Sequence, residues 1–297
     1  MENNTSKIYL HIGFGRTSST TMQNKIFPKI ALIKNMDFIQ GKSFRKRYNC
    51  ASETEAIEKY KHIIEEKKIR NRNLIISDEN LISLYSDTWS PHSYELSFEN
   101  LKKNFDKDSN IIITIRKPSM WLRSVYSRFS DFSSNTEPED FFILAKEFNE
   151  KININKKFII DQFDLKTLIE LYKSHFNNVF VIKFENIPSF EFVERIFNIN
   201  DKEQLIELQK IYLSKKTKIG LNFYTYKINK FLEKIESKYK FILTKIIRIF
   251  SKDFFLNKIL FNILPKKEIK LNLEKKNINL KKLDDSYDSI DEIQNKK

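Results

Sequence analysis

Four short apolar runs, rich in isoleucine, valine and aromatic residues, constrain the fold of this chain most strongly. They cover residues 7–12, 73–77, 110–115 and 178–184. Continuous apolar runs are typical of strands that are buried on both faces, and the segments between them have helical spacing, as in 164–176. Parallel strands are usually joined by helical crossovers. We therefore expect an α/β fold in three layers, with a central parallel sheet flanked by helices, and a helical C-terminal region.

The composition changes along the chain and suggests three parts. Residues 1–220 contain all four runs and form one expected α/β domain. Residues 221–264 have apolar side chains at helical spacing among lysines, so we expect a helical extension that packs on this domain. Binding to a membrane surface is the alternative for that extension. Residues 265–297 alternate Lys with Asp and Glu, which predicts a polar tail that packs poorly and is disordered.

The bulk composition narrows the class of protein. One cysteine excludes a disulfide framework within the chain, and one cysteine with four histidines argues against a Cys/His metal site. The formal net charge of +14 favours anionic partners, although a general lysine bias also explains it. We find no nucleic-acid motif, no apolar signal core and no apolar run of the ~20 residues that a membrane span needs. We therefore expect a cytoplasmic protein, at the inner membrane face if the extension binds lipid.

A glycine-containing turn between Gly13 and Thr21 links the first run to a helical segment. Such a turn presents free backbone N–H groups at one point, and the helix dipole adds partial positive charge there. The residues placed to contact an anion are Gly15, Arg16, Thr17, Ser18, Ser19, Thr20 and Thr21. The segment predicts an anion site, with a simple helix cap as the alternative.

This turn resembles the 5′-phosphosulfate loop of sulfotransferases that use 3′-phosphoadenosine 5′-phosphosulfate (PAPS). That loop reads Gly, two residues, Lys or Arg, Thr/Ser, Gly, then Thr/Ser-Thr. The matching residues are Gly13, Arg16, Thr17, Ser19 and Thr20. Ser18 departs, because the family normally has glycine there, and Arg16 is the rarer choice over lysine. A nucleotide-hydrolysing P-loop fits poorly, because its lysine is replaced by Ser19.

A second motif follows the third run, from Arg116-Lys117-Pro118 to Ser124-Val125-Tyr126. Pro118 suits the first turn of a helix, so Arg116 at the strand end and Ser124 on the helix can converge on one phosphate. The segment is similar to the family's 3′-phosphate motif. An arginine paired with a carboxylate is the alternative explanation.

Two weaker similarities accompany these motifs. Residues 180–187 look like a family strand that ends in an aromatic-Glu-Asp-Leu-type sequence. Residues 212–218, with Lys215 and Lys216, resemble the basic loop that closes over the cofactor. The resemblance covers residues 7–218.

The resemblance implies a P-loop-like fold and a metal-free sulfotransferase that moves a sulfuryl group from PAPS to a hydroxyl acceptor, for which a carbohydrate in a bacterial-type pathway is expected. Arg16 would stabilise the leaving phosphate. Glu79, just after the second run, corresponds to the family's catalytic base, with Asp78 or His92 as alternatives. We expect His11 to be structural.

Ser18 also motivates a different interpretation of the chain. A side chain at this position would crowd the sulfate, which favours a catalytically degenerate relative that binds a nucleotide or an anionic glycan.

Overall fold

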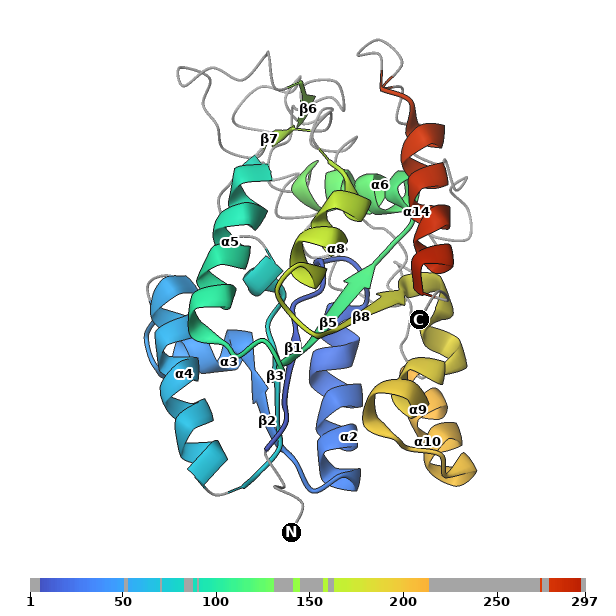
Figure 1. The fold of residues 1–297 in the computed structure, drawn as a ribbon. Coiled ribbons are helices and arrows are strands. Elements are labelled where there is room, and N and C mark those ends of the chain that lie inside the picture. Colours follow the sequence, from blue (N-terminus) through green and yellow to red (C-terminus); the bar gives the residue numbers. More distant parts are fainter. Residues whose placement is uncertain are drawn as a thin grey trace, which may run out of the picture.

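A five-stranded parallel sheet forms the centre of the computed structural model (Figure 1). The structure describes residues 6–50, 53–69, 71–82, 88–89, 91–130, 141–144, 157–159, 163–213, 273 and 278–294. The sheet consists of β1 (Ile8–His11), β2 (Asp37–Gln40), β3 (Leu74–Ser77), β5 (Asn110–Ile115) and β8 (Asn178–Lys183). Their order is β2-β3-β1-β5-β8. The expected parallel sheet and its four apolar strands are confirmed.

The edge strand β2 was not expected from the sequence. Its four residues are only half-buried, and it begins with Asp37 and ends with Gln40. It pairs with β3 along its whole length, from Asp37 opposite Leu74 to Gln40 opposite Ser77. An edge strand needs less apolar surface than a central one, so its sequence signal is weak.

Helices cover both faces of the sheet. They are α1 (Ser19–Thr21), α2 (Phe27–Ile33), α3 (Gly41–Arg47), α4 (Glu53–Ile69), α5 (Pro91–Asn104), α6 (Pro118–Ser130), α8 (Leu165–Lys173), α9 (Glu191–Phe197), α10 (Lys202–Leu213) and α14 (Leu280–Gln294). A π-helical turn, η1 (Met22–Ile26), joins α1 to α2, and the 3₁₀ helices are η2 (Glu79–Ile82) and η4 (Phe184–Ser189). None of the helices in the described ranges is both long and apolar enough to cross a bilayer.

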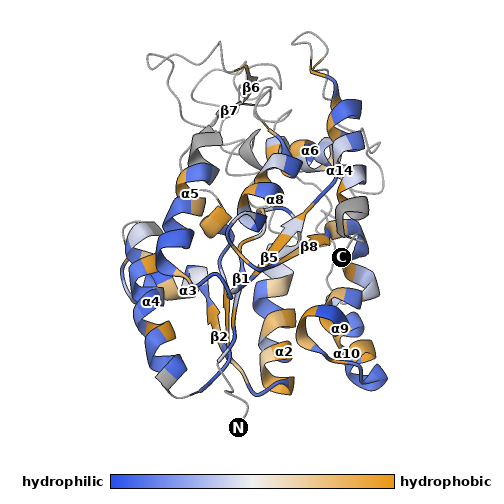
Figure 2. Ribbon diagram, viewed as in Figure 1, coloured by the Kyte–Doolittle hydropathy of each residue, from blue (hydrophilic) through white to orange (hydrophobic). Residues whose placement is uncertain are grey.

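Two hydrophobic clusters separate the two faces. Ile8 and Leu10 of β1 point into a cluster with α4, α5, α6, α8 and α14, whereas Tyr9 points into a cluster with α2, α9 and α10. In β5, Ile111 points into the first of these clusters and Ile112 into the second. Figure 2 shows the apolar strands between helices that carry hydrophilic residues on their outer surfaces. The three-layer α/β architecture therefore follows from strands that are apolar on both faces.

A second, small parallel sheet accompanies the main one. It has the order β4-β7-β6 and consists of β4 (Thr88–Trp89), β6 (Phe142–Ile143) and β7 (Lys157–Ile159). The expected helical extension at 221–264 lies outside the described residues, as does its expected contact with the domain or a membrane.

The tail differs from its expectation over residues 278–294. We expected residues 265–297 to pack poorly, but α14 is a 15-residue helix that packs against α6 and α8. Tyr287 and Ile290 are 3% and 2% exposed. The prediction of a poorly packed tail is wrong here, because a few apolar residues at helical spacing suffice to dock a helix whose other side chains are polar.

The sheet order reverses at β1 and β5, which are neighbours. The chain leaves β1 through α2 toward β2 on one side, and leaves β5 through α6 and α8 toward β8 on the other. In open parallel sheets, the crevice between two such diverging connections lies at the carboxyl ends of the strands and is the usual ligand site.

Gly13 brings the turn after β1 into direct contact with β5. Ile12 N donates to Ile112 O at 3.0 Å and Phe14 N donates to Thr114 O at 3.2 Å, so the backbone pairing continues past the end of β1. A Cβ atom at position 13 would lie 1.8 Å from Thr114 Oγ1 and 2.8 Å from the Thr114 backbone nitrogen. This position therefore requires glycine.

We predict that Gly13→Ala lowers the free energy of unfolding by about 1–3 kcal/mol or more. The added methyl group overlaps Thr114, so β1 and β5 must move apart to make room for it. Urea denaturation measures the loss. Gly15→Ala is the matched control, since its Cβ would find its nearest neighbour at 3.7 Å. Equal stabilities of the two variants would contradict the close-approach explanation.

Candidate functional site

Two strand-to-helix turns meet at the carboxyl ends of β1 and β5. Arg16 Nε donates to Ser124 Oγ at 3.0 Å, and Arg116 Nη1 donates to Arg16 O at 3.4 Å. Trp121 Nε1 donates to Gly15 O at 2.8 Å. These residues come from segments about 100 positions apart in the chain. The structure thus brings together the two motifs that the sequence identified separately.

The turn after β1 has an unusual backbone. Arg16 and Ser18 have φ angles of 69° and 62°, in the left-handed region that favours glycine. Ser18 is the N-cap of α1, yet its side chain makes no capping hydrogen bond, and its Oγ instead lies 3.2 Å from Tyr212 OH. Simple capping by Ser18 therefore does not explain this turn. The first N–H groups of a helix lack intrahelical partners, so this helix start can bind an anion.

The other hydroxyl groups of the turn differ in their surroundings. Thr17 is buried, and its Oγ1 donates to Phe14 O and lies 2.9 Å from Thr114 Oγ1. Ser19 Oγ donates to Glu79 Oε2, Thr20 is exposed and Thr21 is buried. The Thr17 hydroxyl serves the turn itself, whereas Ser19 and Thr20 lie at the helix start.

Arg116 is half-buried beside the turn. Its guanidinium carbon lies 4.5 Å from the centroid of the Phe184 ring, and its Nε is buried without a hydrogen-bond partner. Burial lowers the pKa of Arg116; the Glu185 carboxylate opposes this effect, while the positive charge of Arg16 adds to it. Two guanidinium groups near one another repel, and an anion between them would relieve that repulsion.

The two acidic candidates after β3 have different environments. Asp78 is 1% exposed, pairs with Arg45 Nη1 and accepts a hydrogen bond from Tyr60 OH at 3.0 Å. Burial raises the pKa of Tyr60, and the Asp78 carboxylate acts in the same direction. Glu79 is half-buried and contacts the turn through Ser19. Glu79 therefore borders the candidate site, while Asp78 holds the start of η2 in place, because its Oδ1 accepts from Asn80 N at 3.1 Å.

His11 lies beneath the site and is fully buried. Its Nδ1 lies 2.7 Å from Ser77 Oγ and its Nε2 lies 3.2 Å from Thr114 Oγ1. Burial lowers the pKa of His11 to about 3, so the ring is neutral near pH 7. These contacts link β1 to both of its neighbours, which agrees with the expected structural role.

Three of the sequence candidates cannot be placed. Lys215 and Lys216 lie outside the described residues, and nothing is described of the His92 side chain. Within the described ranges, no group of three His, Cys, Asp or Glu side chains is arranged to hold a metal ion.

The site also contains residues that the motifs did not single out as functional. Trp121 joins the two turns, Tyr212 contacts Ser18, and Phe184 stacks on Arg116. All three lie inside segments that resemble the family, but only the folded chain shows which side chain each of them meets. Trp121 is itself fixed by stacking on Phe163, with ring centroids 5.2 Å apart.

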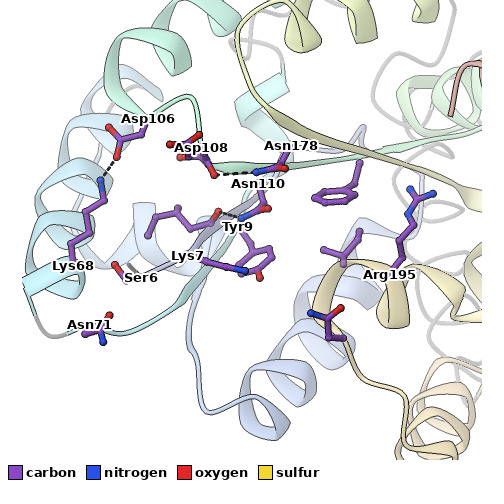
Figure 3. Close-up of a pocket in the computed structure, with 15 residues that line it drawn as sticks. Ser6, Lys7, Tyr9, Lys68, Asn71, Asp106, Asp108, Asn110, Asn178 and Arg195 are labelled. Atoms are coloured by element: carbon purple, nitrogen blue, oxygen red, sulfur yellow. Dashed lines mark hydrogen bonds and ion pairs between the residues drawn. The ribbon is translucent and has the colours of Figure 1, made fainter. Parts of the chain in front are cut away.

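A groove of about 890 Å³ lies at the opposite, amino edge of the sheet (Figure 3). Its polar groups bond mainly to one another: Lys68 pairs with Asp106, and Asn110 Nδ2 donates to Ile8 O at 3.2 Å. Because ligands of parallel sheets bind at the carboxyl ends of the strands, we place the candidate site at the two turns.

Comparison with models of known protein families and with curated protein sequences found no match for this chain.

The strain at Ser18 gives a testable consequence. Ser18→Gly and Ser18→Ala both lose the contact with Tyr212, but only alanine keeps a Cβ atom at φ 62°. We predict that the glycine variant is more stable than the alanine variant by about 1 kcal/mol. Thermal denaturation of the pair measures this difference. An alanine variant at least as stable would show that the left-handed conformation is not maintained.

Proposed function

We propose that this chain is a sulfotransferase with a P-loop-like fold, which moves a sulfuryl group from PAPS to a hydroxyl acceptor. The main support is the convergence of Arg16, Arg116 and Ser124 at the carboxyl ends of two neighbouring strands. Two arginines from different turns, beside a helix start, suit a ligand with two anionic groups. PAPS is such a ligand, and the resemblance of both turns to sulfotransferase motifs favours it over other nucleotides.

Each turn has its own role in this proposal. The N–H groups at Ser19 and Thr20, together with Arg16, would bind the 5′-phosphosulfate. Arg116 and Ser124 would bind the 3′-phosphate, with the Arg116 guanidinium placed over the Phe184 ring. A stacked guanidinium loses little freedom on binding and offers its planar fork to phosphate oxygens.

Glu79 would act as the general base. As the acceptor oxygen attacks sulfur, a new S–O bond forms, and the bond from sulfur to the 5′-phosphate oxygen breaks. The acceptor proton passes to Glu79, and the negative charge that develops on the departing phosphate is stabilised by Arg16 and the helix start. The contact of Glu79 with Ser19 supports this role, because it places the carboxylate beside the turn.

A carbohydrate is the proposed acceptor class. Next to the end of β3, Gln40 Nε2 donates to Asn24 Oδ1, and Ser43 Oγ donates to Gln40 Oε1. Gln40 lies opposite Ser77, two residues before Glu79. Exposed amide and hydroxyl groups can both donate and accept, as recognition of sugar hydroxyls requires.

A catalytically degenerate protein that binds a nucleotide or anionic glycan is the second candidate. The observation that favours it is the buried Ser18 side chain at the position where the sulfotransferase loop has glycine. Assays of binding and turnover separate the two functions.

Arg116→Ala tests the 3′-phosphate role. Loss of charge-assisted hydrogen bonds should weaken the affinity for adenosine 3′,5′-bisphosphate by roughly 10- to 100-fold, as measured by calorimetry. The control is Arg195→Ala, which removes an exposed arginine from the opposite edge of the sheet. Equal affinities of the two variants for the bisphosphate would exclude Arg116 from the site.

Glu79→Gln tests the catalytic role. We expect the rate of sulfate transfer from labelled PAPS to a glycan mixture to fall by about a hundredfold or more, because the general base is lost. Affinity for adenosine 3′,5′-bisphosphate should stay within about twofold, and Glu99→Gln on the exposed face of α5 is the control. Turnover near that of the wild type would exclude Glu79 as the base. Binding without turnover in the wild type would support the degenerate candidate.

A further inference from the structure

The C-terminal helix α14 contacts the residues that flank Arg116. Asp284 Oδ1 accepts a hydrogen bond from Ser119 N at 2.9 Å, and Asp288 Oδ2 lies 3.6 Å from Lys117 Nζ. Tyr287 OH donates to Glu185 Oε2. These contacts dock α14 at the start of α6, the helix that carries Ser124 (Figure 1).

We infer that Tyr287 is a positioning residue, which holds the Glu185 carboxylate away from Arg116 and so keeps that guanidinium available for the 3′-phosphate. This inference rests on the proposed function. Tyr287 itself belongs to neither of the two resembling motifs, since it lies about 70 residues beyond the segment that resembles the family.

Glu185 and Arg116 occupy the ends of neighbouring strands. Ile115 of β5 lies opposite Lys183 of β8, so the residues that follow each strand are also close. Phe184 stacks on Arg116, and Glu185 is near enough for its charge to raise the pKa of that arginine. An arginine at a strand end commonly pairs with a nearby carboxylate, so an ion pair between Arg116 and Glu185 would be expected.

The described contacts of Glu185 point elsewhere. Its Oε1 accepts from Lys117 N at 3.4 Å and its Oε2 accepts from Tyr287 OH. Among the residues that the structure describes, no carboxylate forms an ion pair with Arg116, whose Nε is buried without a partner. Both oxygens of the nearest acidic side chain are therefore used by other donors.

The Tyr287 side chain is held firmly beside Glu185. Its side chain is 3% exposed, and the Lys183 ammonium lies 4.4 Å from the ring centroid. Lys183 itself is 6% exposed. A buried ring with a cation on its face cannot easily rotate away from Glu185. Without the hydroxyl, one oxygen of Glu185 loses its donor, and Arg116, on which the Glu185 charge already acts, can take its place.

The experiment compares two nucleotides. Calorimetry gives the dissociation constants of adenosine 5′-monophosphate and adenosine 3′,5′-bisphosphate. The monophosphate constant divided by the bisphosphate constant isolates the contribution of the 3′-phosphate. In Tyr287→Phe, we expect this ratio to fall by roughly tenfold, which corresponds to ~1.4 kcal/mol. The affinity for the monophosphate should not change.

A second variant distinguishes competition by the Glu185 carboxylate from a simple loss of packing at Tyr287. Glu185→Gln combined with Tyr287→Phe removes the competing carboxylate, so it should restore the wild-type ratio. Glu185→Gln alone should bind the bisphosphate at least as tightly as the wild type. Tyr9→Phe is the matched control, because Tyr9 is a similarly buried tyrosine at the amino edge of the sheet, and its ratio should stay unchanged.

Three results would overturn the inference. An unchanged ratio in Tyr287→Phe would show that Glu185 does not compete for Arg116. A loss that persists in the double variant would show that the hydroxyl supports only the packing of α14. If the wild type does not distinguish the two nucleotides, the assignment of the 3′-phosphate fails together with the role of Tyr287, whereas the first two results leave the proposed function intact.

Discussion

The backbone contact between Gly13 and Thr114 is the constraint on which the rest of the site depends. Because no side chain separates them, the pairing of β1 with β5 continues to Phe14, and the turn that follows starts directly beside the end of β5. Thr114 Oγ1 then meets both His11 and Thr17, which fixes the inner side of the turn. Arg16 and the helix start lie on the outer side of the turn. A wider separation of the two strands would pull Arg16 away from Ser124.

The charges at the two turns determine which kind of ligand this geometry suits. The half-buried Arg116 lies close enough to the exposed Arg16 for the two charges to repel, which is unfavourable unless an anion joins them. The nearby carboxylates have other donors: Glu79 accepts from Ser19, Asp78 from Arg45 and Tyr60, and Glu185 from Tyr287. In the proposed function this charge arrangement is what selects a ligand with two phosphate-type groups.

The sequence predicted the parts of the fold that local patterns encode. Central strands such as β5 are recognisable because six consecutive buried residues leave little choice of structure, whereas the half-buried β2 has no such signal. In the site, Arg116 and Ser124 were recognisable from their fixed spacing along a strand and a helix. Tyr212 and Tyr287 were not, since their roles arise from contacts with residues 194 and 102 positions away. The packing of α14 was missed for the same reason.

A crystal structure of the wild-type protein with adenosine 3′,5′-bisphosphate tests the central claim most directly. The account predicts the 5′-phosphate at the N–H groups of Ser19 and Thr20, and the 3′-phosphate between Arg116 and Ser124. A nucleotide bound away from the two turns, for example beside Arg195 in the groove at the amino edge of the sheet, would contradict it.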